Sequence, residues 1–215
     1  MARPQSAFFH SKKWKPTASL ERHKGRMDGV VFHNLLRKHR DRVFSHAWYV
    51  LRNREDAEDV TQEVFVKLWE HGKEIDPGKT EAWIMRVTHN ACIDCCRRRS
   101  RKQKRQRDLE AEGAADAAAW RPQEWDPEGA FEWTETQRIL LSAMDELPAS
   151  VRSLLLMHYF QDMPMDRIGE AVGMSESAVK VAVHRGRKKL KKALIKRNPE
   201  WSRRIGYVER IVQTG

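Results

Sequence analysis

Residues 165–194 read MDRIGEAVGMSESAVKVAVHRGRKKLKKAL, and their spacing predicts two helices separated by a tight turn. Ile168 and Val172 lie on the inward face of the short first helix. Gly169 is small where two helices must cross closely, and Gly173 permits the turn between them. Ser175 is a favourable N-cap for the second helix. Together these features predict a helix-turn-helix unit.

The second helix of this unit has two contrasting faces. Its inward stripe consists of small or apolar residues, namely Val179, Val183, Gly186, Leu190 and Leu194. Its outward face is mostly polar or basic and carries Glu176, Ser177, Lys180, Val181, His184 and Lys188. A helix that reads DNA needs short polar side chains near its N-terminus for base edges, followed by cations for phosphates. We therefore predict DNA binding, with a solvated basic hairpin as the alternative.

Composition supports a nucleic-acid partner. The 215 residues include 41 Lys and Arg against 30 Asp and Glu, a formal net charge of +11. No run approaches the roughly 20 apolar residues that cross a bilayer, and the first 26 residues lack the apolar segment of a secretory signal. Three clustered cysteines are too few for a disulfide framework. These features predict a cytoplasmic protein without membrane insertion.

Charge is arranged in blocks that suggest domain boundaries. Residues 97–107 contain eight Lys or Arg and no acid, whereas residues 108–135 contain nine acids and one base. The acidic segment is rich in Ala, Gly and Pro, which is typical of a linker. We expect a disordered basic extension, a first domain, an irregular acidic linker, a second domain and a tail, at 1–26, 27–107, 108–134, 135–197 and 198–215.

Both domains are predicted to be helical, so the expected fold class is all-α. In the first domain, apolar residues recur at helical spacing in two segments, at Leu36, Val43, Ala47 and Leu51 and at Ala57, Val60, Val64 and Leu68. Asp76-Pro77-Gly78 is a turn signal, and Thr80 is the expected N-cap of a third helix. In the second domain, Thr134 with Gln137 resembles a capping box, and Pro148 suits the first turn of the next helix.

Longer motifs resemble the extracytoplasmic-function (ECF) sigma factors, the smallest class of bacterial RNA polymerase specificity subunit. DAEDVTQEVFVKLWE at 56–70 and AWIMRVTHNACIDCCRRRSR at 82–101 resemble sigma region 2. LPASVRSLLLMHYFQDMPMDRIGEAVGMSESAVKVAVHRGRKKL at 147–190 resembles sigma region 4. The resemblance implies a protein that binds core polymerase, directs it to promoters and promotes strand opening.

The resemblance assigns a role to each motif. The helix over 56–70 is expected to dock on core polymerase through Asp59, Gln62 and Glu63, which share one polar face. The loop 71–79 and the third helix are expected to bind the minus-ten element, with contacts from Lys73, Lys79, Asn90, Arg97 and Arg98. The helix-turn-helix is expected to bind the minus-35 element through Glu176, Ser177, Lys180, His184 and Lys188.

Two positions depart from the family pattern. Arg167-Ile168-Gly169 stands where the family usually has Glu-Ile-Ala. Val181-Ala182 stands where a serine–arginine pair often follows Val-Lys, which removes a DNA-contacting arginine. The resemblance further implies that the linker threads through the polymerase, and that an anti-sigma factor can regulate the chain.

Other functions find less support in the sequence. No nucleophile–base pair, phosphate-binding loop or paired carboxylate site stands out, so we predict neither enzymatic activity nor a cofactor or metal. A stand-alone helix-turn-helix regulator remains the main alternative, and a basic RNA-binding adaptor a second one. His89, Cys92 and Cys96 recur at i, i+3 and i+7. Buried core cysteines are commoner than a metal site with this spacing on one helix.

Overall fold

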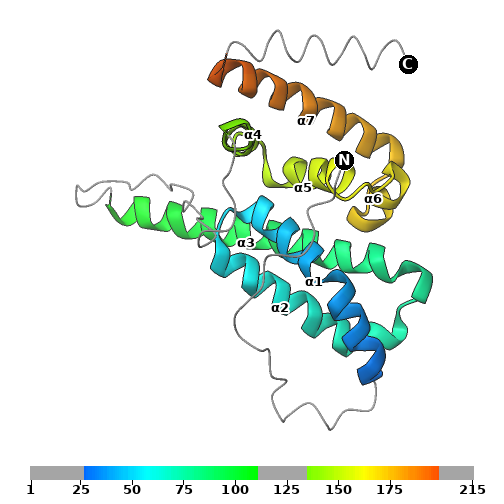
Figure 1. The fold of residues 1–215 in the computed structure, drawn as a ribbon. Coiled ribbons are helices and arrows are strands. Elements are labelled where there is room, and N and C mark those ends of the chain that lie inside the picture. Colours follow the sequence, from blue (N-terminus) through cyan, green and yellow to red (C-terminus); the bar gives the residue numbers. More distant parts are fainter. Residues whose placement is uncertain (1–26, 111–134, 199–215) are drawn as a thin grey trace, which may run out of the picture.

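The computed structural model describes residues 27–110 and 135–198, with side chains placed for 27–106 and 138–198. The extension, the linker and the tail predicted from charge lie almost entirely outside these residues. Within them the chain forms seven α-helices and no strand, which confirms the all-α expectation. The helices are α1 (Gly29–Leu51), α2 (Arg54–His71), α3 (Thr80–Glu110), α4 (Glu135–Met144), α5 (Ala149–Tyr159), α6 (Met165–Val172) and α7 (Glu176–Arg197) (Figure 1).

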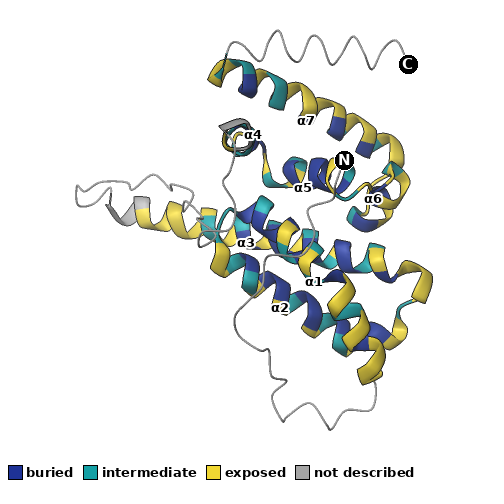
Figure 2. Ribbon diagram, in the orientation of Figure 1, coloured by how far each residue is buried: buried dark blue, intermediate teal, exposed yellow. Residues whose placement is uncertain are grey.

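Helices α1, α2 and α3 form the first domain. Asp28 caps α1 by accepting hydrogen bonds from the amides of Val30 and Val31, and Asn53 caps α2 through the amide of Asp56. Most of the apolar residues predicted to face inward are buried in one shared core, including Val43, Ala47, Leu51, Ala57, Val60, Val64 and Leu68. Figure 2 shows buried positions along α1, α2 and α3. The helical spacing thus predicted this core correctly.

The connection between α2 and α3 is a turn, as expected, but its cap differs. Two short 3-10 turns cover Gly72–Glu74 and Pro77–Lys79. The Asp76 side chain accepts a hydrogen bond from the Gly78 amide at 2.8 Å. Thr80, predicted as the N-cap of the third helix, already has helical backbone angles and is its first residue. The Asp-Pro-Gly segment shapes the entry into α3, and the Thr80 hydroxyl donates a hydrogen bond back to the Asp76 carbonyl oxygen at 3.3 Å.

Helices α4 to α7 form the second domain, which contains the predicted helix-turn-helix. Gly173 ends α6 with a left-handed φ of 71°, and the Ser175 hydroxyl accepts a hydrogen bond from the Ala178 amide. A Cβ on Gly169 would lie 2.6 Å from the Met174 carbonyl oxygen. The small residue therefore accommodates the backbone of the turn itself. Pro148 directly precedes α5 as its N-cap residue.

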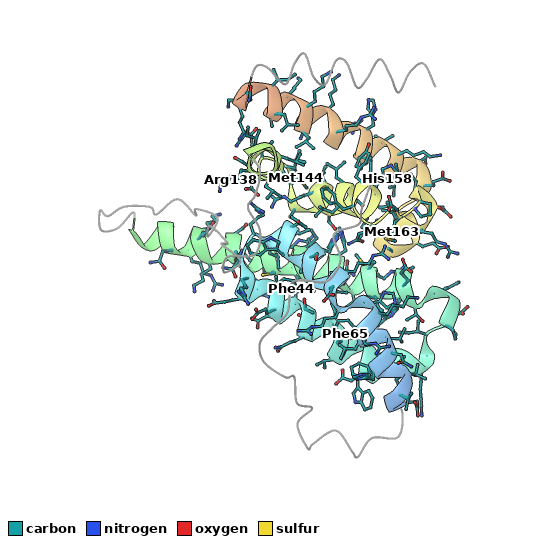
Figure 3. The ribbon with its side chains drawn as sticks, viewed as in Figure 1. Phe44, Phe65, Arg138, Met144, His158 and Met163 are labelled. Atoms are coloured by element: carbon teal, nitrogen blue, oxygen red, sulfur yellow. The ribbon has the colours of Figure 1, made fainter. Side chains whose placement is uncertain are left out.

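The two domains pack directly on one another. Helix α3 contacts α5 and α6, and α1 contacts α5, so α4–α7 stand above α3 in Figure 1, with α7 at the top and α2 at the bottom. Met85 of α3 is buried in the core of the second domain, beside residues such as Leu154 and Ile168. Side chains fill each domain as well as the boundary, with Phe65 in the first domain and Met163 in the second (Figure 3).

Candidate functional site

Helix α2 presents the three predicted docking residues on one side. Asp59 and Gln62 are exposed, and Glu63 is half-buried, with its carboxylate paired with the Lys67 ammonium at 2.6 Å. The opposite side of the helix is buried in the core of the first domain through Val60 and Val64. The structure therefore places the predicted residues together on an open face.

An exposed valine lies on the same face and was missed by the sequence reasoning. Val66 is 54% exposed and follows Gln62 by four residues and Glu63 by three, so it lies next to both. Single exposed apolar residues are common on protein surfaces, but this one shares a face with all three predicted docking residues. Its position at helical spacing from Asp59 was the signal in the sequence. We call Asp59, Gln62, Glu63 and Val66 the docking face.

Other acids near the start of α2 have structural partners. Asp56 pairs with Arg99 of α3, and Glu58 pairs with Arg54 at 2.9 Å. The Arg99 guanidinium also donates a hydrogen bond to the Leu51 carbonyl oxygen at 3.2 Å. The contacts of Arg99 hold the α1–α2 connection against α3. Asp56 and Glu58 are therefore engaged in ion pairs within the protein, whereas Asp59 is exposed.

The predicted minus-ten residues follow α3 in a line. Lys73 and Lys79 are exposed in the connection before this helix, and Asn90, Arg97 and Arg98 are exposed along it. Eighteen residues separate Thr80 from Arg98, which at about 1.5 Å per residue is about 27 Å of helix. The structure therefore brings these side chains into an extended track and not into one compact pocket. Asn90 and Arg97 are seven residues apart and so share one side of the helix.

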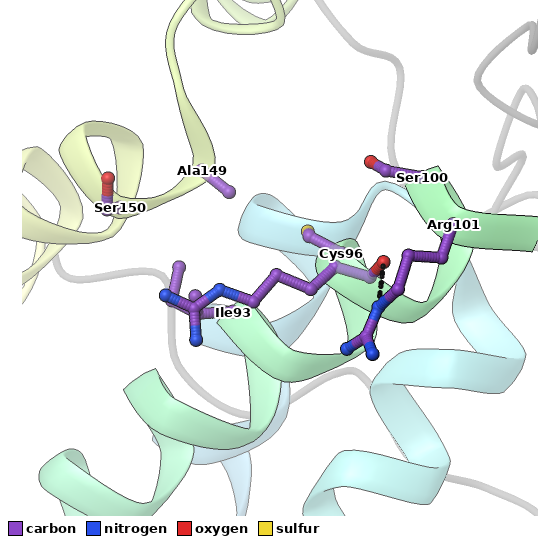
Figure 4. A pocket seen from close by; sticks show the side chains of 7 residues that line it. Ile93, Cys96, Ser100, Arg101, Ala149 and Ser150 are labelled. Carbon is purple, nitrogen blue, oxygen red and sulfur yellow. Dashed lines mark hydrogen bonds between the residues drawn. The ribbon is translucent and has the colours of Figure 1, made fainter. Parts of the chain in front are cut away.

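A small open pocket lies beside this track. It is lined by α3 residues and by the start of α5, namely Ile93, Cys96, Arg97, Ser100, Arg101, Ala149 and Ser150 (Figure 4). The Arg101 side chain bends back to donate a hydrogen bond to the Arg97 carbonyl oxygen at 3.4 Å. The pocket therefore belongs to the boundary between the two domains.

Of the hypothetical metal set, His89 has another partner, Cys92 is buried and Cys96 is half-buried. His89 is hydrogen-bonded to Ser153 of α5. Cys92 is fully buried, and burial raises the pKa of its thiol well above the ordinary value. Burial also raises the pKa of Cys96, which lines the pocket. Within residues 27–106 and 138–198 no group of His, Cys, Asp and Glu could hold a metal ion.

The outward face of α7 carries all five predicted minus-35 residues, and each is exposed. Glu176 and Lys180 form an exposed ion pair at 2.5 Å, so these two candidates are neighbours on this face. Val181 is 48% exposed and follows Ser177 by one helical turn. The inward face packs on α5, where a Cβ on Gly186 would lie 2.5 Å from a Val151 methyl group. Glycine thus allows the close approach that orients α7.

Comparisons with known proteins agree with this geometry. Residues 35–102 match the family model "Sigma-70 region 2", and residues 137–190 match "Sigma-70, region 4". The ECF RNA polymerase sigma factor SigE of Mycolicibacterium smegmatis is 30% identical over 168 residues, which is 77% of this chain and 62% of that protein. SigW of Bacillus subtilis is 27% identical over 171 residues, covering 78% of this chain and 90% of that protein.

Two solved structures have a similar fold. The sigma factor RpoE of Bartonella quintana, in complex with the anti-sigma factor NepR, has a TM-score of 0.58 at 18% identity. That match covers 76% of this chain and 96% of the other. CnrH, in complex with the cytosolic domain of CnrY, has a TM-score of 0.53 at 20% identity, covering 80% and 91%. No helix in the described part of the chain is long and apolar enough to cross a membrane.

Proposed function

The chain belongs to the extracytoplasmic-function group of sigma-70 factors, and we propose that it binds core RNA polymerase, directs it to specific promoters and promotes strand opening. The observation that supports this best is a pair of exposed surfaces on one chain. Helix α2 presents acids, and helix α7 presents cations. An acidic surface suits a protein partner, whereas a basic helix face suits DNA. A subunit that recruits an enzyme to DNA requires both.

We propose that core polymerase binds the docking face of α2. The carboxylates of Asp59 and Glu63 would meet cations of the partner and orient the encounter. Val66 would supply apolar area at the centre of the contact, where water is excluded most completely. The face is open in the structure because α2 contacts α1 and α3 but carries no extensive contact with the second domain.

We further propose that the minus-ten element lies along α3. Lys73, Lys79, Arg97 and Arg98 would contact phosphates, and Asn90 would contact a base. Capture of an unstacked base costs a few kcal/mol, and several phosphate contacts spaced along a helix can offset that cost. The extended arrangement of these residues fits a strand that follows the helix.

For the minus-35 element we propose that α7 enters the major groove. Ser177, the Glu176–Lys180 pair and His184 would meet base edges, and Lys188 would contact a phosphate. Val181 projects from the centre of this face. An apolar side chain there suits a thymine methyl group, so the departure from the family's serine–arginine pair changes the preferred base at that step.

The remaining properties follow from this role. The protein would act by binding, without catalysing a reaction itself, and in the cytoplasm, where promoters and polymerase are found. RpoE and CnrH were each solved with a partner, NepR and CnrY respectively. An anti-sigma factor is accordingly a further partner that we propose for this chain.

Gel filtration with bacterial core polymerase, followed by promoter-dependent transcription, tests the function. Co-elution and initiation from a specific start site are the expected results. If the chain binds duplex DNA but neither co-elutes with core polymerase nor supports initiation, it is a stand-alone helix-turn-helix regulator instead.

A further inference from the structure

A buried cluster of polar side chains lies where the two domains meet. The Ser153 hydroxyl of α5 is 2.8 Å from Nε2 of His46 in α1 and 2.8 Å from Nδ1 of His89 in α3. The Gln161 amide nitrogen is 3.1 Å from Nδ1 of His46. Ser153 and His46 are almost fully buried. We call His46, His89, Ser153 and Gln161 the histidine cluster.

The hydrogen bonds of this cluster form a chain with one direction. The Gln161 amide donates to Nδ1 of His46, so that nitrogen carries no proton. Nε2 of His46 therefore carries the ring proton and donates to Ser153. The hydroxyl of Ser153 is then free to donate to Nδ1 of His89. Every step of this chain uses a neutral imidazole, and both rings belong to the first domain while both partners belong to the second.

The charged groups around the cluster also disfavour a protonated ring. On α1, Arg42 pairs with Glu81 of α3 at 2.5 Å and donates to the Gln161 carbonyl oxygen at 3.2 Å. On α3, Arg86 donates to the carbonyl oxygens of Glu170 and Ala171 at the end of α6.

On α5, Arg152 is buried beside Ser153 and pairs with Asp145 at 3.2 Å. It also donates to the Val50 carbonyl oxygen of α1 at 2.9 Å. Each nearby carboxylate thus already has an arginine partner. Among the described residues, no acid is left over at the cluster to stabilise an imidazolium ion.

The closed arrangement keeps the two predicted DNA-binding helices near each other. Helix α3 touches α6, and α7 follows α6 after three residues. Helices are about 10 Å across, so α7 lies within about 20–30 Å of α3. The positions that name the minus-ten and minus-35 elements differ by about 25 base pairs, which is about 85 Å at about 3.4 Å per pair. One closed molecule cannot reach both elements.

We propose that the histidine cluster is a proton-sensitive contact that holds the two domains closed at neutral pH and releases them as the pH falls. Protonation of either ring adds a proton to Nδ1, which then can no longer accept the hydrogen bond from Gln161 (at His46) or from Ser153 (at His89). It also places a cation in a buried site rich in arginine. The amide oxygen of Gln161 is buried without a hydrogen-bond partner among the described residues. The closed form therefore already carries one unsatisfied polar atom, which makes separation less costly.

The direction of the pH effect follows from proton linkage. Burial, followed by the charges of His89 and Arg42, lowers the pKa of His46 to about 3, and burial lowers the pKa of His89. In separated domains both rings would meet water and return to a pKa near 6.5. The open form therefore binds protons more tightly. Closure is fully favoured above pH 6.5 and weakens as the pH falls from 6.5 towards 3.

This linkage has a measurable size. Between pH 7.5 and pH 5.5, a histidine that titrates only in the open form lowers the ratio of closed to open molecules about tenfold. Two such histidines lower the ratio up to about a hundredfold. The consequence for transcription rests on the proposed function, whereas the opening itself does not.

Small-angle X-ray scattering of the full chain at pH 7.5 and pH 5.5, without DNA or polymerase, tests the inference. We expect a larger radius of gyration at pH 5.5, reversed when the pH is raised, with helix content by circular dichroism unchanged. A variant with His46→Gln and His89→Gln should show no pH response in radius. His71→Gln, which changes an exposed histidine at the end of α2, is the matched control and should respond like the original chain.

Two outcomes would overturn the inference. One is an unchanged radius of the original chain between the two pH values. The other is a double variant that expands with acid as much as the His71→Gln control. If the double variant loses helix, Ser153→Ala replaces it. This variant should be more open at pH 7.5 and should expand at a higher pH than the original chain, because one hydrogen-bond partner of each ring is lost while both rings remain. An unaltered radius at every pH would refute the role of the cluster. Opening is measured without polymerase, so its failure leaves the sigma function standing.

Discussion

Val66 and Val181 provide a reciprocal test of the two proposed surfaces. Both are valines on exposed helix faces, one on α2 and one on α7, and they are exposed to similar extents, 54% and 48%. Replacing either by alanine removes two methyl groups without changing charge. If α2 faces polymerase and α7 faces DNA, Val66→Ala should weaken only the first interaction, and Val181→Ala only the second.

The expected size follows from the area that binding can still bury. A buried methylene is worth about 0.8 kcal/mol, so two methyl groups are worth about 1.6 kcal/mol when fully buried. About half of each side chain is already covered in the free protein, which leaves about 0.8–0.9 kcal/mol for the interface. This corresponds to an increase of about fourfold to fivefold in Kd.

The assays separate the two interactions. Titration of the fluorescently labelled chain with core polymerase measures docking, and gel shifts with the assembled holoenzyme measure promoter affinity. Thermal unfolding should give the same midpoint for both variants, because neither valine is buried in a core. Deoxyuridine in place of thymine in the minus-35 element should reproduce the Val181→Ala effect, since it removes only the methyl group.

Two results would refute this reasoning. If Val66→Ala leaves core affinity unchanged while Val181→Ala weakens it, polymerase does not dock on α2. If both variants weaken both interactions equally, the valines act through the fold and not through separate surfaces.

Three further changes test other parts of the account. Asp59→Ala with Gln62→Ala should weaken core binding in the same titration and leave the unfolding midpoint intact, and unchanged affinity would contradict the docking assignment. Lys188→Gln should weaken holoenzyme binding to all promoters alike and reduce the slope of log K against log salt by about one; a sequence-dependent effect would instead indicate base contact. Gly173→Ala should cost about 1–2 kcal/mol in urea unfolding because alanine is strained at a φ of 71°, with Gly173→Asn costing less, and equal stability of all three proteins would refute the strain.

The fold could be predicted where the turn, capping and helical-spacing patterns of a segment all indicate the same structure. The Gly173 turn, the Ser175 cap and the inward stripe of α7 follow from backbone freedom, side-chain hydrogen bonding and helical spacing, each of which is local in the sequence. The prediction that Thr80 is an N-cap was wrong because threonine is also tolerated in the first turn of a helix. The turn before α3 is stabilised by the Asp76 side chain, which accepts a hydrogen bond from the Gly78 amide. Local preference alone did not decide between these two arrangements.

The candidate surfaces were partly predictable for the same reason. Charge and spacing placed Asp59, Gln62 and the α7 residues on open faces, because polar side chains on an amphipathic helix point away from its core. Val66 was missed because sequence analysis assigns apolar residues to the interior. Only the observed exposure separates an apolar residue on the docking face from one in the core.

The contact between the domains explains why the metal hypothesis arose. Helix α3 has two buried stripes. Ile84, Thr88, Ala91 and Cys95 lie on the first. Met85, His89, Cys92 and Cys96 lie on the second, roughly 100° around the helix, where Met85 and Cys92 are buried and His89 and Cys96 are half-buried. The first stripe packs within its own domain, while Met85 and His89 meet the second domain. The spacing of His89, Cys92 and Cys96 is therefore that of a packing stripe. A helix buried on two sides has a weak amphipathic pattern, so its second partner was not evident from the sequence.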